Sequence, residues 1–259
     1  MSKIKEAFKN KAFIGFLTAG DPDMESSEKY ILDMIRAGAD LIEIGIPFSD
    51  PVAEGEVIQA ATLRALKSGT TVDKVFSLVE SLRKKTDVPF VFLTYLNPVF
   101  NYGYDIFFAK CQKAGVDGII IPDLPYEEKN EVETVADKYG VDLIPLVAPT
   151  SRDRVQKIAK GAKGFVYIVS SMGVTGVRKE ITTDLETIVK AVKEVTDTPC
   201  AIGFGISTPE QAKKMAALSD GVIVGSAIIK LLEKYGKDAP DHIGAYVKAM
   251  KDSLKSKPL

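Results

Sequence analysis

Short runs rich in β-branched and aromatic residues alternate along the chain with longer segments of helical pattern, and this alternation limits the possible folds more than any other feature. Eight such runs occur, at residues 13–17, 41–45, 90–95, 118–121, 143–147, 165–170, 201–204 and 222–224. Between them, apolar residues recur at helical spacing, as in residues 26–35, 72–82 and 209–218. The pattern predicts eight strand–helix units.

A common lead-in precedes four of the predicted strands. It reads Gly38-Ala39-Asp40, Gly115-Val116-Asp117, Gly140-Val141-Asp142 and Ser219-Asp220-Gly221. A glycine that stops a helix, followed by a tight turn into a buried parallel strand, explains this repeat. No two-residue hairpin signal interrupts the order, so we expect the strands to be parallel.

Eight parallel units favour a sheet that closes on itself. We therefore predict an α/β fold, a single-domain (β/α)8 TIM barrel that spans residues 1–259. The alternative is an open doubly wound sheet, which usually has a glycine-rich nucleotide loop after its first strand. Here the first predicted strand runs instead into Thr18-Ala19-Gly20-Asp21-Pro22, which favours the barrel.

The composition excludes several classes of protein. Hydrophobic residues make up 46% of the chain and the formal net charge is -1, so we expect neither a nucleic-acid partner nor a membrane surface. No segment approaches the roughly 20 apolar residues of a membrane span and no signal-peptide pattern is present, so the predicted location is the cytoplasm. Cys111 and Cys200 are too few and too far apart for a disulfide framework or a metal cluster.

Glu43 is the most unusual acid, because it lies in the middle of the second predicted strand. Either face of a barrel strand is buried, by side chains inside or by helices outside. Burial raises the pKa of a carboxyl group, which suits general acid–base catalysis near neutral pH. The alternative is a structural glutamate paired with a buried arginine or lysine, although no other strand shows an obvious inward-facing base.

A long polar turn follows this strand and contains three further acids, Asp50, Glu54 and Glu56, before a helix expected to begin near Val57. Two prolines restrict the turn, so its acids can be aimed. Taken one at a time, each of them is more readily explained as a solvated loop residue.

Three glycine-bearing strand ends follow one another late in the chain. They are Gly173-Val174-Thr175-Gly176, Gly203-Phe204-Gly205 and Gly225-Ser226. Barrels often bind phosphate between the loops after strands seven and eight, with backbone N–H groups and a helix N-terminus, and Ser226 opens a predicted helix. Turns need glycine in any case, so it is the order of the three motifs on consecutive strands that predicts a phosphate site.

Four aromatic residues fall near predicted strand ends: Phe16, Tyr95, Tyr167 and Phe204. Such rings can enclose a flat apolar substrate at a barrel mouth. Packing in the core is the more usual role of any one of them.

Together these motifs resemble the tryptophan synthase alpha family. The resemblance rests on residues 16–22, 43–51, 97–100, 173–176, 203–207 and 225–228, in family order over nearly the whole chain. It implies a lyase that cleaves indole-3-glycerol phosphate to indole and D-glyceraldehyde 3-phosphate, in the last step of tryptophan biosynthesis. It also implies an α2β2 complex with a tryptophan synthase beta subunit. Pyridoxal phosphate is then expected only in that beta subunit, and this chain is expected to need no cofactor and no metal.

The resemblance also implies roles for single residues. Glu43 matches the proton-transfer residue, and Tyr167 matches a residue beside it. The positions that match the phosphate contacts are Gly176, Gly205, Gly225 and Ser226, and those that match the indole pocket are Phe16, Tyr95 and Phe204. Residues 171–183 resemble a lid that Thr175 holds closed. The positions expected to contact the beta subunit are Asp50, Pro51, Asn97 and Pro98.

One position departs from the family pattern. Where the family usually has Ala-Asp-Gly-Pro, this chain has Ala53-Glu54-Gly55-Glu56. Glu54 thus stands where an aspartate is expected to accept the indole N–H and stabilise the cationic indolenine intermediate. Its arm is one methylene longer, and a misplacement of about 1 Å can lower a rate on the order of a hundredfold.

The longer arm leaves a second function open, namely a catalytically weak regulatory subunit that binds and activates the beta subunit. A third alternative is another phosphate-binding barrel lyase or isomerase. That alternative would require the whole set of motifs to coincide by chance.

Overall fold

The strands of the computed structural model are all parallel and belong to one sheet. The structure describes residues 3–169, 185–203 and 205–255, and within them the strand order is β5-β4-β3-β2-β1-β9-β8-β7-β6. The strands are β1 (Ala12–Thr18), β2 (Leu41–Gly45), β3 (Phe90–Leu93), β4 (Gly118–Ile120), β5 (Asp142–Leu143), β6 (Leu146–Val147), β7 (Val166–Val169), β8 (Cys200–Gly203) and β9 (Gly221–Val224). All eight predicted strands are confirmed.

The fifth predicted strand is divided into β5 and β6, and this division closes the barrel. β5 pairs with β4, whereas β6 pairs with β7. Between the two halves, the Ile144 N–H donates to the Ile119 carbonyl on one side, and the Pro145 carbonyl accepts the Tyr167 N–H on the other. Pro145 has no N–H of its own to donate. One continuous segment therefore joins both edges of the sheet, which excludes the open doubly wound alternative.

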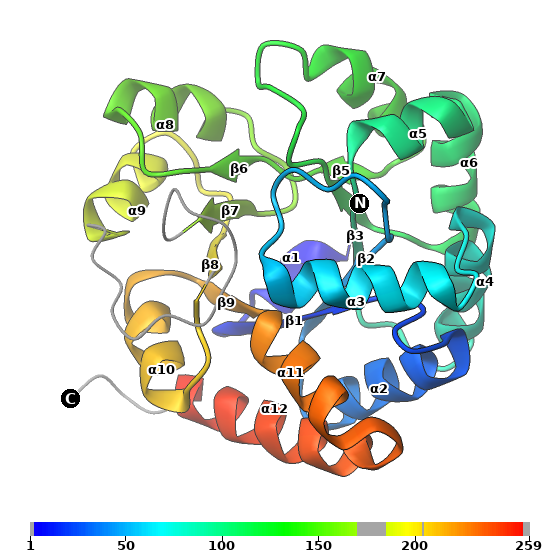
Figure 1. Cartoon of the computed structure of the whole chain (residues 1–259). Helices are drawn as coiled ribbons and strands as arrows, with labels where there is room; N and C mark the ends of the chain where they lie inside the picture. The colour runs from blue at the N-terminus through cyan, green and yellow to red at the C-terminus, as the bar shows by residue number, and fades with distance from the viewer. Residues whose placement is uncertain (1–2, 170–184, 204, 256–259) are drawn as a thin grey trace.

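Helices surround the strands on the outside, as Figure 1 shows. They are α2 (Met24–Arg36), α3 (Glu56–Lys67), α4 (Val72–Arg83), α5 (Leu96–Tyr102), α6 (Tyr104–Ala114), α7 (Asn130–Lys138), α8 (Arg152–Ala159), α9 (Leu185–Lys193), α10 (Pro209–Leu218), α11 (Ser226–Tyr235), the short η1 (Gly236–Asp238) and α12 (Ala239–Lys255). In the part of the chain that the structure describes, no helix is both long and apolar enough to cross a lipid bilayer.

Strand alternation sorts the buried side chains into two apolar layers. The interior layer includes Ile14, Leu41, Val91, Ile120 and Phe165, which point toward the barrel axis, while the alternate side chains pack beneath the helices. Ile4, from the short helix α1 (Ile4–Ala7), belongs to the interior layer. Helix α1 thus covers the amino-terminal end of the barrel and leaves the carboxyl ends of the strands for the site.

The aspartates of the repeated lead-in bind the neighbouring strand. The Asp40, Asp117 and Asp220 carboxylates accept the backbone N–H groups of Phe13, Phe90 and Cys200, respectively. Each acceptor precedes one strand and each donor lies at the start of the strand beside it. The lead-in therefore stops a helix and also satisfies an N–H near the start of an adjacent strand, which the turn interpretation alone did not predict.

An ion pair between buried Asp21 and partly exposed Arg64 joins the loop after β1 to helix α3. Asp21 is 2% exposed, and its two carboxylate oxygens lie 2.7 and 2.8 Å from the Arg64 Nε and Nη2 atoms. The geometry is bidentate, which is the strongest arrangement for an arginine–carboxylate pair. Because α3 follows the loop that contains Glu54, this ion pair fixes one end of the predicted site.

Replacing Arg64 with methionine is expected to lower the free energy of unfolding by about 3 kcal/mol, because the Asp21 charge stays buried without its partner. Urea unfolding at neutral pH measures this loss. Arg152→Met is the matched control, since Arg152 is 61% exposed and pairs with Glu194 at the surface; its loss should stay below about 1 kcal/mol. Equal losses in the two variants would contradict the proposed importance of burial.

Candidate active site

Glu43 projects into the barrel from the middle of β2. In the sheet it is in register with Phe16 of β1 and Val91 of β3, and Val91 belongs to the interior layer. The Glu43 side chain is 2% exposed, and its Oε2 atom has no hydrogen-bond partner among the described residues. Desolvation by burial raises the pKa of Glu43 from 4.5 to about 8. This is a carboxyl group that can both donate and accept a proton near neutral pH.

Tyr167 points into the same interior from β7. It is 5% exposed, and burial, followed by the nearby Glu43 charge, raises the pKa of its phenol well above the usual value. Gly203 on the adjacent strand β8 makes room for this ring, because a Cβ atom there would lie 2.4 Å from the Tyr167 hydroxyl. The structure thus brings Glu43 and Tyr167 together, as the resemblance implied.

Phe16 fills the interior beside Glu43 and depends on two glycines. A Cβ atom at Gly45 on β2, or at Gly225 after β9, would lie 2.9 Å from the Phe16 ring. Gly225 therefore has a packing role in addition to its place in the predicted phosphate motif. The ring is 6% exposed and forms an apolar wall at the carboxyl ends of the strands.

The loop between β2 and α3 is bound to Tyr95, which directly follows β3. The Ala53 N–H donates to the Tyr95 hydroxyl at 3.1 Å, and the Phe48 and Tyr95 ring centroids are 5.6 Å apart. Tyr95 is 1% exposed, and burial raises the pKa of its phenol to about 12. The ring lies at the predicted pocket, and its hydroxyl also holds the loop, which the sequence did not suggest.

Glu54 is partly buried in this loop. Its carboxylate accepts a hydrogen bond from the Thr62 hydroxyl on α3, with the Thr62 Oγ1 atom 3.4 Å from Oε2, and lies near the Tyr95 hydroxyl. Burial raises the pKa of Glu54, and the two hydroxyls oppose that effect. Of the three loop acids, Asp50 and Glu56 are exposed, so Glu54 is the one that the structure places in a partly buried, hydrogen-bonded position.

The predicted phosphate residues lie at the ends of two neighbouring strands. Gly205 follows β8 with a φ of 82°, a conformation that favours glycine, and Gly225 and Ser226 follow β9, with Ser226 as the first residue of α11. The free N–H groups at the start of a helix attract anions. The remaining predicted contacts, at Thr175, Gly176 and Phe204, and the predicted lid at 171–183 lie outside the described residues.

The segments predicted to contact a partner are exposed at the barrel mouth. Asp50 and Asn97 are exposed, and Pro51 and Pro98 are partly buried. Each segment also exposes a large apolar side chain: Val52 is 73% exposed and Phe100 is 62% exposed. The two segments follow the neighbouring strands β2 and β3, and exposed apolar side chains are typical of protein–protein contacts.

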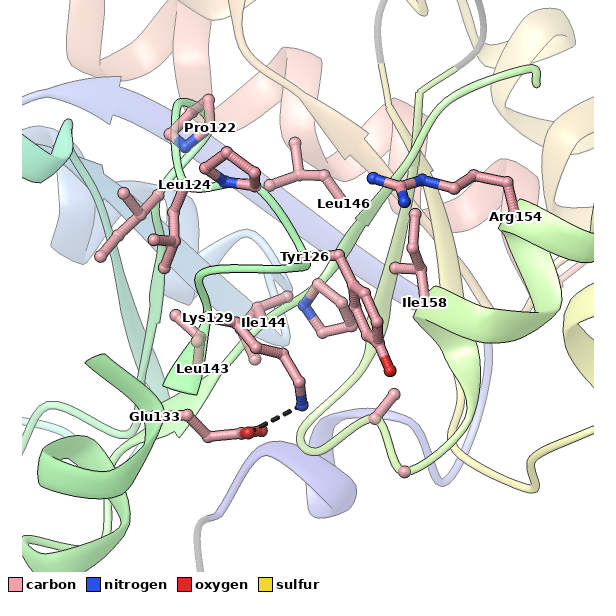
Figure 2. Close-up of a pocket in the computed structure, with 15 residues that line it drawn as sticks. Pro122, Leu124, Tyr126, Lys129, Glu133, Leu143, Ile144, Leu146, Arg154 and Ile158 are labelled. Atoms are coloured by element: carbon pink, nitrogen blue, oxygen red, sulfur yellow. Dashed lines mark hydrogen bonds and ion pairs between the residues drawn. The ribbon is translucent and has the colours of Figure 1, made fainter. Parts of the chain in front are cut away.

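A separate cavity of about 200 Å³ lies beside the fifth strand, between the segment that leads into α7 and helix α8. Figure 2 shows Tyr126 and the Lys129–Glu133 ion pair on its wall, with Arg154 on the opposite side. None of the residues predicted for catalysis or substrate binding lines this cavity. This cavity is therefore distinct from the predicted site at the carboxyl ends of the strands.

The structure adds residues that the sequence analysis did not single out. Thr62 contacts Glu54, and the sequence gave no sign of it, because it is one of many polar residues on a helix. Thr18 ends β1 in register with Gly45 and is 1% exposed, and its hydroxyl has no hydrogen-bond partner among the described residues. Its place at a strand end, two residues before Gly20, was the available signal.

Comparisons with known proteins agree with the barrel fold described above and identify one family. Residues 1–256 match the family model described as tryptophan synthase alpha chain. The tryptophan synthase alpha chain of Lacticaseibacillus casei is 52% identical over 258 residues, covering 99% of this chain and 97% of that protein. Among solved structures, tryptophan synthase subunit alpha from Legionella pneumophila str. Paris is 36% identical with a TM-score of 0.89, covering 98% of both chains.

A second solved structure comes from an assembly. It is the tryptophan synthase α2β2 complex of the hyperthermophile Pyrococcus furiosus, 36% identical with a TM-score of 0.87 over 95% of this chain and 99% of that chain. Fold and site define the class of the present protein as a (β/α)8-barrel lyase with a buried acid at the carboxyl ends of its strands. Within that class, the chain belongs to the tryptophan synthase alpha chain family.

The Glu43 carboxyl is expected to make stability depend on pH. In the folded protein it keeps its proton up to about pH 8, whereas in the unfolded chain it ionises above about pH 4.5. Unfolding is therefore favoured increasingly as pH rises between these values. Glu43→Gln removes this effect, so its stability relative to the wild type should increase by on the order of 4 kcal/mol from pH 4 to pH 8.

Urea unfolding at several pH values tests this expectation. Glu80→Gln on the exposed face of α4 is the matched control, since the same substitution there buries nothing. Parallel stability curves for the wild type and Glu43→Gln would show that burial does not perturb this carboxyl group.

Proposed function

We propose that this chain cleaves indole-3-glycerol phosphate to indole and D-glyceraldehyde 3-phosphate, with Glu43 as the proton-transfer residue. The observation that supports this most is the Glu43 carboxyl, which is buried inside the barrel with its Oε2 atom lacking a hydrogen-bond partner among the described residues and with its pKa raised to about 8. Since family membership fixes the reaction class, the remaining question is which groups perform each step. Glu43 has the position and the pKa that the chemistry requires.

The reaction needs one proton to arrive and one to leave. The neutral Glu43 carboxyl donates a proton to indole C3, which creates the cationic indolenine. The carboxylate then accepts the proton of the glycerol hydroxyl on the carbon attached to C3, as that C–O bond becomes a carbonyl and the carbon–carbon bond breaks. The bonding electrons return to the indole ring, so Glu43 ends in its starting protonation state.

Binding groups surround this acid on three sides. Phe16, Tyr95 and Phe204 enclose the indole ring, and the Glu54 carboxylate accepts the indole N–H and stabilises the indolenine charge. The phosphate binds to the strand ends and the α11 N-terminus, through Thr175, Gly176, Gly205, Gly225 and Ser226. Tyr167 packs beside Glu43 and helps to exclude water, since its ring is buried.

We further propose that the chain works without a metal or an organic cofactor and pairs with a tryptophan synthase beta subunit that holds pyridoxal phosphate, in an α2β2 complex in the cytoplasm. Exposed Val52 and Phe100, next to Asp50, Pro51, Asn97 and Pro98, support an interface at the barrel mouth. Indole released in the barrel then leaves on the side where the partner binds.

Indole release from indole-3-glycerol phosphate is the direct test. The purified chain is expected to release indole, more rapidly with a tryptophan synthase beta subunit, and Glu43→Gln should lower kcat at least about a hundredfold because it cannot exchange protons. Glu80→Gln should match the wild type. If no form turned over while beta-subunit activity was still stimulated, the chain would be a regulatory subunit and the proposed reaction would be wrong.

A further inference from the structure

We propose that Tyr95 and Thr62 are positioning residues for Glu54, which hold its carboxylate at the depth from which it accepts the indole N–H. This inference rests on the proposed function, because it concerns the same substrate contact. It also addresses the departure from the family pattern: the longer glutamate arm has its own set of partners in this chain.

The contacts place Glu54 between two fixed elements. The Tyr95 hydroxyl accepts the Ala53 N–H at 3.1 Å, and it lies close enough to the Glu54 carboxylate to lower the pKa of that group, so one phenol acts on both the backbone and the side chain of the loop. The Thr62 hydroxyl donates from α3 to the carboxylate Oε2 atom at 3.4 Å. Tyr95 and Thr62 are 1% and 3% exposed, and both belong to the packed barrel, so neither can follow a movement of the loop.

The backbone of Glu54 is held in addition to its side chain. The Gln59 Nε2 atom on α3 donates to the Glu54 carbonyl at 2.7 Å. With the backbone and the carboxylate both bound, the number of methylene groups between them is constrained. An aspartate at this position has the same backbone anchor but a shorter reach, so its carboxylate withdraws from Tyr95 and Thr62.

The two hydroxyls also favour the charge state that the contact needs. Burial disfavours the Glu54 carboxylate, and the hydroxyls of Thr62 and Tyr95 lower the pKa of Glu54 in opposition to burial. An ionised carboxylate accepts the indole N–H and stabilises a cation, whereas a neutral carboxyl group does so poorly. Loss of either hydroxyl is therefore expected to raise the pKa of Glu54.

Kinetics of indole release across pH 5 to 9 test the proposal with Tyr95→Phe and Thr62→Val, which delete the hydroxyls and keep the shapes. Tyr95→Phe and Thr62→Val should each lower kcat/KM by about three- to tenfold and move the acidic limb of the profile to higher pH, because each variant loses a hydroxyl that lowers the pKa of Glu54. Tyr139→Phe is the matched control, because it removes a hydroxyl that donates to exposed Asp105, outside the predicted site.

Glu54→Asp distinguishes two hypotheses: that the glutamate is held in a productive position by its partners, or that its longer side chain lowers the activity. Activity should fall, and Tyr95→Phe should then cost less than about twofold in that background, because the two residues no longer touch. A gain in kcat/KM from Glu54→Asp, with an unchanged cost of Tyr95→Phe, would overturn the inference. So would a Tyr95→Phe variant with the wild-type rate and pH profile.

A readout without turnover separates this inference from the proposed function. In protein labelled with 13C at the glutamate carboxyl carbons, the Glu54 signal is the one missing from Glu54→Gln. Its titration midpoint should rise in Tyr95→Phe and in Thr62→Val and stay constant in Tyr139→Phe. An absence of indole release in every form would reject the reaction alone, whereas an unchanged Glu54 midpoint in both hydroxyl variants would reject the positioning role.

Discussion

The interior of this barrel is organised around one unfavourable feature, the burial of the Glu43 carboxyl, whose Oε2 atom has no hydrogen-bond partner among the described residues. A buried polar group without a hydrogen bond costs on the order of 1–3 kcal/mol, and a salt bridge would remove that cost. It would also hold the group ionised and lower its pKa, which would end its use as an acid. The surrounding apolar layer, which includes Ile14 and Ile223, offsets this free-energy cost by its own burial and excludes water from the carboxyl group.

Glycines determine where the large rings can stand around this carboxyl. Gly45 and Gly225 leave room for Phe16, and Gly203 leaves room for Tyr167, with virtual Cβ distances of 2.9, 2.9 and 2.4 Å, respectively. Glycines at the ends of β2 and β8 and directly after β9 thus let two aromatic rings enclose the acid. Gly225 also belongs to the predicted phosphate motif, so this glycine serves both packing and close backbone approach to a ligand.

Much of the fold was predictable because it depends on local patterns. The signals for strands, for helices and for glycines that end helices each span only a few residues. The inward position of Glu43 follows from its place in a short strand. Contacts between distant segments were not predictable. The division of strand five at Pro145 depends on which neighbours it meets, and the Tyr95 contact with Ala53 joins residues 42 positions apart. Asp40, Asp117 and Asp220 repeat visibly, yet their acceptor role requires knowing which strand lies alongside.

Glu43 and Glu54 illustrate how the surroundings of two identical side chains can give them different protonation states and different roles. Glu43 is buried and its Oε2 atom has no hydrogen-bond partner among the described residues, so its neutral form is favoured and it can move protons. Burial raises the pKa of Glu54 as well, but the hydroxyls of Thr62 and Tyr95 oppose that rise and support the carboxylate that can stabilise a cation. The reaction needs a protonated acid and a carboxylate at the same moment. Two glutamates can supply both, because different surroundings separate the pKa values of two carboxyl groups. A longer arm at Glu54 is compatible with this division as long as its two donors stay within reach.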